Sequence, residues 1–183
     1  DQDESIVASM VSRFENKKHE NDPAGPALEE RDRQYQLRAI SPLRAPFFTA
    51  GWDGVSTVIL ATEHTRLDSA QMASLRQWLF SGGRLWIMVD RVSSDYCSHL
   101  LGEDYPCEVV GTASLNSVKI QGLKADNQER QYARPVELVR LLAPGYETIH
   151  RVGAWPVSAT RRVGLGTVLL TTLEARAWAD DQI

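Results

Sequence analysis

Residues 55–90 constrain the fold more than any other part of the chain, because they predict a strand, a helix and a second strand in succession. The segment has apolar runs at residues 58–61 and 85–89, and neither run alternates as a half-exposed strand does. A strand that is buried on both faces of a parallel sheet shows such a continuous apolar pattern. We therefore expect a parallel β-α-β unit with the usual right-handed crossover.

Local signals mark both ends of the helix between these strands. Asp68 is a typical N-cap residue, and Gln71 three positions later completes a capping box. Leu75 and Leu79 then recur at helical spacing. The glycine pair at 82–83 predicts the end of the helix, because glycine adopts the left-handed conformation of a C-cap without steric cost.

Composition bounds the class of protein. The chain has 183 residues, of which 43% are hydrophobic, so it can bury the core of one ordinary domain. Its net charge of −4 argues against a nucleic-acid-binding surface. No apolar run is long enough to span a membrane, so we expect membrane contact only through segments outside this chain. The chain begins at Asp1 without methionine, which suggests a fragment of a longer protein.

The pattern along the chain predicts two regions. Residues 1–32 are expected to form an amphipathic helix followed by a polar linker, and residues 33–183 to form one α/β domain. Beyond residue 90 we expect a short helix near Cys97, and a β-hairpin around Gly164 and Gly166. Other expected elements are strands at 108–110, 114–121, 147–152, 155–162 and 167–173, a polar loop at 124–134 and a helical turn at 135–142. The expected fold class is a three-layer α/β domain, with a mostly parallel sheet flanked by helices and a late β-hairpin at one edge.

Several of these pieces resemble the class I glutamine amidotransferase-like family. The residues that carry the resemblance are Trp52-Asp53-Gly54 before the first strand, the helix with its Gly-Gly end, and the 162–168 segment RVGLGTV. The resemblance covers residues 33–173 and is greatest to non-catalytic members found in bacterial membrane-anchored proteins. It implies a flavodoxin-like fold and a location on the extracytoplasmic, periplasmic face of a bacterial membrane protein.

The catalytic residues of that family are not found in this sequence. Active members place a nucleophilic cysteine on a sharp turn after a central strand, with a histidine and a glutamate downstream. Here the second strand is followed by Arg91, Val92 and Ser93, and His150 is not followed by the expected glutamate. We therefore expect no catalytic residues, no cofactor and no metal.

Polar residues follow both strands of the β-α-β unit. Glu63 and His64 come after the first strand, and Asp90 and Arg91 come after the second. Ligands bind beyond the carboxyl ends of strands in open α/β sheets, so these four residues are the candidate ligand site. The alternative is that Glu63 and His64 are solvated loop residues, while Asp90 caps the next helix or pairs with Arg91.

Cys97 and Cys107 are the two cysteines of the chain. Their spacing fits neither a structural zinc site nor a Cys-x-x-Cys redox motif. Two interpretations remain open, which are a disulfide across a short loop and two unrelated thiols.

The leading hypothesis for function is a non-enzymatic soluble domain of a larger bacterial membrane protein, used for protein interaction or ligand sensing. Its expected partners are other parts of the parent protein or a protein complex, and no nucleic acid. The alternative is a hydrolase or a metal- or anion-binding enzyme that uses Glu63, His64, Asp90 and Arg91.

Overall fold

The computed structural model describes residues 44–62, 67–122 and 128–178. The chain divides into two compact units, Ile40–Glu174 and a second unit made of Asp1–Ala39 with Ala175–Ile183. Within the second unit, the described residues contain one 3-10 turn, η3 (Ala175–Ala177). The helix and linker predicted in residues 1–32, and the predicted domain start at residue 33, lie outside the described residues.

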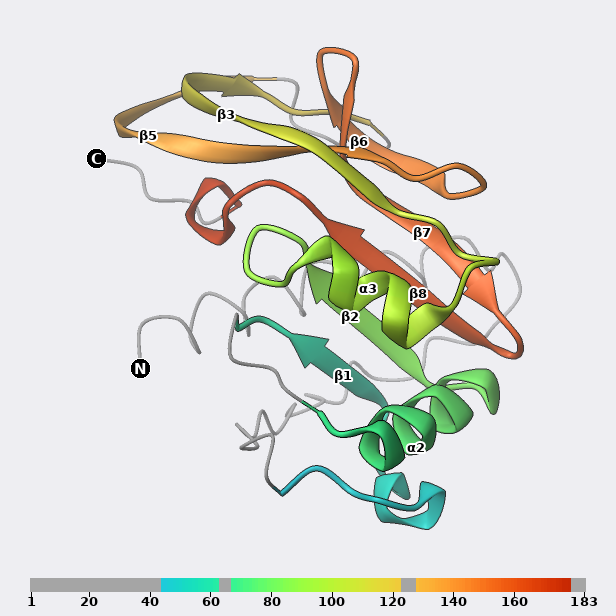
Figure 1. Cartoon of the computed structure of the whole chain (residues 1–183). Helices are drawn as coiled ribbons and strands as arrows, with labels where there is room; N and C mark the ends of the chain where they lie inside the picture. Colours follow the sequence, from blue (N-terminus) through green and yellow to red (C-terminus); the bar gives the residue numbers. More distant parts are fainter. Residues whose placement is uncertain (1–43, 63–66, 123–127, 179–183) are drawn as a thin grey trace, which may run out of the picture. The chain divides into compact units, whose positions relative to one another are not determined.

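The predicted β-α-β unit is confirmed. Strand β1 (Thr57–Leu60), helix α2 (Ser69–Phe80) and strand β2 (Arg84–Met88) follow in order, and β1 pairs with β2 in parallel (Figure 1). The capping box is also present. The Gln71 backbone N–H donates to Asp68 Oδ1 at 2.8 Å, and the Asp68 backbone N–H donates to Gln71 Oε1 at 3.0 Å.

The main sheet of the described residues is mixed, with strand order β1-β2-β8-β7-β6-β4. Strand β8 (Gly166–Thr171) pairs in parallel with β2 and antiparallel with β7 (Trp155–Val163). Strands β6 (Glu147–Val152) and β4 (Gln121–Gly122) continue the antiparallel side. The sheet is therefore parallel on one side of β8 and antiparallel on the other.

A second, two-stranded sheet is formed by β3 (Glu108–Lys119) and β5 (Glu129–Leu142), which make a long antiparallel ribbon (Figure 1). An isolated bridge between Leu138 and Leu173 joins β5 to the segment after β8. The ribbon is thus attached to the chain beyond β8 through β5, and β3 is its outer strand.

One face of the main sheet carries the apolar core. Helices α2 and α3 (Ser94–Leu101) both contribute to the same buried cluster as strands β2 and β8. Buried members of this cluster include Leu75, Leu79, Leu85, Ile87, Leu100, Val168 and Leu170. The two α-helices of the described residues therefore pack on one and the same side of the sheet.

The predicted three-layer architecture is wrong, and the flavodoxin-like fold that the resemblance implied is wrong with it. The described residues form a sheet-rich fold with a mixed sheet, instead of a mostly parallel sheet flanked by helices. The hairpin around Gly164 and Gly166 exists, but it is not at an edge. Strand β8 of this hairpin lies between β2 and β7, because it pairs with β7 along one edge and with β2 along the other.

The helical turn predicted at residues 135–142 is also wrong, since these residues belong to strand β5. The proline that suggested a helix start, Pro135, lies where the register between β3 and β5 shifts. A register shift tolerates proline, because a regular ladder hydrogen bond is not needed there. The two strands predicted at 108–110 and 114–121 are instead one strand, β3, and β5 begins within the predicted polar loop.

Candidate functional site

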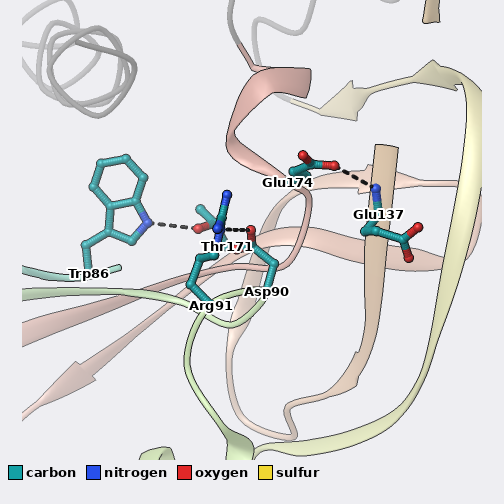
Figure 2. Close-up of polar contacts among 6 residues, drawn as sticks. All are labelled: Trp86, Asp90, Arg91, Glu137, Thr171 and Glu174. Carbon is teal, nitrogen blue, oxygen red and sulfur yellow. Dashed lines mark hydrogen bonds and ion pairs between the residues drawn. The ribbon is translucent and has the colours of Figure 1, made fainter. Parts of the chain in front are cut away.

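Asp90 and Arg91 lie just beyond the carboxyl end of β2, where the sequence placed a ligand site. The Asp90 side chain is only 5% exposed, whereas the Arg91 side chain is 44% exposed. Arg91 Nε is 3.6 Å from Asp90 Oδ2, so a half-exposed guanidinium forms an ion pair with a buried carboxylate (Figure 2). Of the alternative expected for Asp90, the pairing with Arg91 is present, whereas the capping of the next helix is not, because the N-cap residue of α3 is Ser93.

The Asp90 carboxylate is poorly compensated in its buried position. Within the described residues no side chain donates a hydrogen bond to Oδ1 or Oδ2. Burial raises the pKa of Asp90 to about 6, and the nearby charge of Glu174 adds to this effect. A backbone hydrogen bond and the Arg91 guanidinium oppose it but do not cancel it. Asp90 is therefore a carboxyl group that loses its proton near neutral pH.

The residues around Asp90 come from β2 itself and from the end of β8, which is far away in the sequence (Figure 2). The Trp86 indole N–H of β2 donates to the Thr171 hydroxyl at the end of β8, at 2.9 Å (Figure 2). Glu174 accepts a hydrogen bond at Oε2 from the Glu137 backbone N–H at 3.1 Å. Sequence reasoning missed Thr171 and Glu174, although the rule that selected Asp90 applies to the carboxyl end of any parallel strand.

Glu63 and His64 lie outside the described residues, so only half of the sequence-predicted site can be placed. The enzyme alternative that uses them stays a prediction. Within the described ranges no three His, Cys, Asp or Glu side chains are grouped to hold a metal ion. In the same ranges no helix is long and apolar enough to cross a membrane.

A buried serine–histidine pair lies on the antiparallel side of the sheet. His150 Nδ1 and Ser158 Oγ are 2.7 Å apart, across the pairing of β6 with β7. Ser158 is fully buried and His150 is only 3% exposed. A substrate cannot reach a hydroxyl that is fully enclosed, so this pair stabilises the sheet and is not assigned a nucleophilic role.

Cys97 and Cys107 are both buried in the apolar core. They are free thiols in the structure and hydrogen-bond to each other. This hydrogen bond, together with burial, raises the pKa of the Cys97 thiol, and the same hydrogen bond lowers the pKa of Cys107. The two sulfurs are therefore neighbours, and the disulfide stays one of the two open interpretations, which oxidation can check.

Treatment of the folded protein with diamide is expected to join Cys97 and Cys107. The two thiols give up two electrons and two protons to the diazene, which becomes a hydrazine, and a disulfide forms between neighbouring sulfurs. After denaturation, thiol titration should then detect neither of the two thiols, and no disulfide-linked dimer should form. Two titratable thiols after prolonged oxidation, or a dimer that Cys107→Ser preserves, would contradict the pairing.

The outer edge of β3 is a second candidate surface. Backbone groups of Val139 and Glu137 on β5 point away from β3, because they bond to the segment after β8 at 2.8 and 3.0 Å. In an antiparallel ladder, the residues paired with them then point away from β5 as well. These are Thr112 and Ser114, which pair with Val139 and Glu137. The N–H and C=O groups of Thr112 and Ser114 therefore face the free edge, where β3 pairs with no other strand of the described residues.

No family model matches the chain, and no curated protein matches it in sequence. Its fold resembles cytoplasmic protein STM1381 from Salmonella typhimurium LT2, with a TM-score of 0.53 and 12% identity over 70% of this chain and 64% of that one. It also resembles cytoplasmic protein STM3548 from Salmonella typhimurium, with a TM-score of 0.55 and 8% identity over 72% and 65%. A third similar structure is the mmIFT52 N-terminal domain, with a TM-score of 0.52 and 15% identity over 74% and 72%.

At such low identities these similarities concern the fold alone. The chain spans 64% and 65% of the lengths of the two Salmonella proteins. The amidotransferase-like resemblance is wrong. The similar solved structures are these Salmonella proteins, and the fold is rich in strands with a mixed main sheet. The expected extracytoplasmic location is corrected with it, since it depended on that resemblance and both Salmonella neighbours are named as cytoplasmic proteins.

Proposed function

We propose that the chain is a non-enzymatic interaction domain that binds an extended strand of a partner polypeptide along β3. The observation that carries this proposal is the free edge of β3, where the backbone groups of Thr112 and Ser114 point outward. An extended segment that adds to such an edge gains main-chain hydrogen bonds whatever its side chains are.

The side chains along β3 favour pairing over protection. Proteins usually blunt a free edge with lysines, prolines or inward-pointing charges. The ten residues from 109 to 118 carry no charge and no proline, and the charged residues Glu108 and Lys119 stand only at the ends. From Gly111 to Leu115 the register with β5 is continuous, so this stretch is a regular template for a further strand.

Thr112→Lys is expected to abolish partner binding while the domain stays folded. The Thr112 side chain is exposed, so a lysine there adds charge to the edge without entering the core. Thr148→Lys is the matched control, because Thr148 is an exposed threonine on β6. The tagged protein would be purified with its partner from its own cells, and we expect Thr112→Lys, but not Thr148→Lys, to lose the partner.

Hydrogen exchange locates the contact in the same preparation. The amides of Thr112 and Ser114 should exchange rapidly in the isolated chain and become protected in the complex. Protection of these two amides in the dilute isolated chain would show that the edge is already covered. That result would contradict the proposal, as would a partner that Thr112→Lys retains or the absence of any partner.

A further inference from the structure

The guanidinium of Arg140 on β5 lies beside Gly111 of β3, in the place where another residue would carry its side chain. The two residues are direct partners in the ladder between β3 and β5. A Cβ built on Gly111 would lie 2.6 Å from Arg140 Nη2 and 3.4 Å from its Cζ. Because directly opposed residues project their side chains to the same face, the Arg140 side chain extends across β3 toward its free edge.

A contact with Trp155 of β7 holds this guanidinium without neutralising it. The Arg140 Cζ lies 5.5 Å from the centroid of the Trp155 ring, and such a cation–π contact leaves the charge in place. Among the described residues no carboxylate lies within ion-pair distance of Arg140. The residue is half-buried, so a carboxylate interacts with it more strongly than with a fully solvated cation. The edge of β3 therefore carries one fixed positive charge beside Gly111.

An antiparallel strand added to β3 would place one of its side chains at this charge. Thr112 and Ser114 point their backbone groups outward, so they would form the hydrogen-bonded pairs with the added strand. Gly111 would then form a non-hydrogen-bonded pair, in which the side chains lie closest and the Cα atoms are about 4.5 Å apart. Since Gly111 has no side chain, the partner residue opposite it faces the Arg140 guanidinium.

We propose that β3 selects an extended partner segment with a glutamate or aspartate opposite Gly111, whose carboxylate binds the Arg140 guanidinium. This inference rests on the proposed function and adds the chemistry of the partner to it. The main-chain hydrogen bonds of a strand edge accept any sequence. A carboxylate that accepts parallel N–H bonds from a guanidinium adds specificity as well as affinity.

A second copy of β3 does not supply this carboxylate. In antiparallel registers that pair Thr112 or Ser114 of one copy with either residue of the other, the residue opposite Gly111 lies between positions 113 and 117. Residues 109–118 of β3 carry no charge. The position of Arg140 therefore favours a different polypeptide segment over self-association along β3.

The test begins with a library of random peptides of about ten residues, displayed on phage and selected on the whole folded chain. An enriched peptide is synthesised with its acidic residue and, separately, with the matching amide. Hydrogen exchange at Thr112 and Ser114 locates the bound peptide, and calorimetry measures its dissociation constant. We expect the peptide to protect both amides, and replacement of the acid by the amide to weaken binding by about tenfold.

A double-mutant cycle assigns this loss to Arg140. Arg140→Gln should bind the acidic peptide and its amide equally, whereas Arg162→Gln, at an exposed arginine of β7, should keep the preference. Urea denaturation shows whether both variants fold. Arg140→Lys is the second variant, and it should reduce the preference without abolishing it, because lysine keeps the charge but lacks the planar fork.

The outcomes separate this inference from the proposed function. If the peptides protect Thr112 and Ser114 but the amide binds as tightly as the acid, the inference is overturned and the proposed function stands. The same holds if Arg140→Gln, or Arg140→Lys where the glutamine variant does not fold, keeps the full preference. If no peptide protects these two amides, both proposals fail.

Discussion

Gly166→Ala is expected to cost about 3 kcal/mol or more of the free energy of unfolding. A Cβ at this position would overlap the carbonyl oxygen of Leu79 and lie 2.5 Å from that of Gly83. Both contacts are with backbone, which cannot give way as a flexible side chain can. The hairpin turn is also bonded there, since the Leu165 N–H donates to the Phe80 carbonyl at 2.9 Å. Relief of the clash would separate the turn from the end of α2.

Urea denaturation measures this loss, and Leu165→Ala is its matched control. Leu165 is 72% exposed in the same turn, so its truncation should change stability by no more than about 0.5 kcal/mol. If Gly166→Ala were as stable as Leu165→Ala, the close approach of the turn to α2 would be disproved. The contact between the turn and α2 also aligns β8 beside β2. The Gly166→Ala variant therefore tests the parallel pairing of β2 with β8.

The parts of the fold that the sequence predicted are those set by local interactions. The capping box of Asp68 and Gln71 needs only residues three apart, and both of its hydrogen bonds are present. The two apolar runs that became β1 and β2 were recognisable for a similar reason. A continuous apolar run can be read from the strand itself, whatever its neighbours are, although burial is nearly complete in β2 and only partial in β1.

What the sequence did not predict is the pairing between distant segments. The turn at Gly164 showed that β7 and β8 form a hairpin, but no local signal indicated that β8 also pairs with β2. The ribbon was missed for the same reason. Strand β5 pairs with β3 across an intervening loop, and its proline, Pro135, imitated a helix start.

The candidate site shows the same division. Asp90 and Arg91 were predicted, because their place after a strand can be read from the strand alone. Thr171 and Glu174 were not, since they reach the same end of the sheet only through the pairing of β8 with β2. The outward direction of the Thr112 backbone likewise depends on bonds that β5 makes beyond β8.

Asp90→Asn is expected to stabilise the protein at neutral pH, by up to about 3 kcal/mol. The pKa of Asp90 is raised to about 6 in the folded protein, from an ordinary value of 3.8. The folded state therefore holds this proton more tightly than the unfolded state does. Stability from Asp90 is fully present below its ordinary pKa and is lost as the pH rises through about 6. Asparagine carries no charge, so it avoids that loss.

Denaturation of both proteins from about pH 4 to about pH 7 measures this effect as a difference. We expect similar stabilities at the acidic end and a growing advantage for Asp90→Asn as the pH rises. The other ionisable groups act on both proteins alike, and Arg91 and Glu174, the charges that act on Asp90, are unchanged. Asp104→Asn, an exposed control, should track the wild type within about 0.5 kcal/mol. A constant difference in stability between Asp90→Asn and wild type across this pH range would mean that Asp90 is well solvated or already compensated.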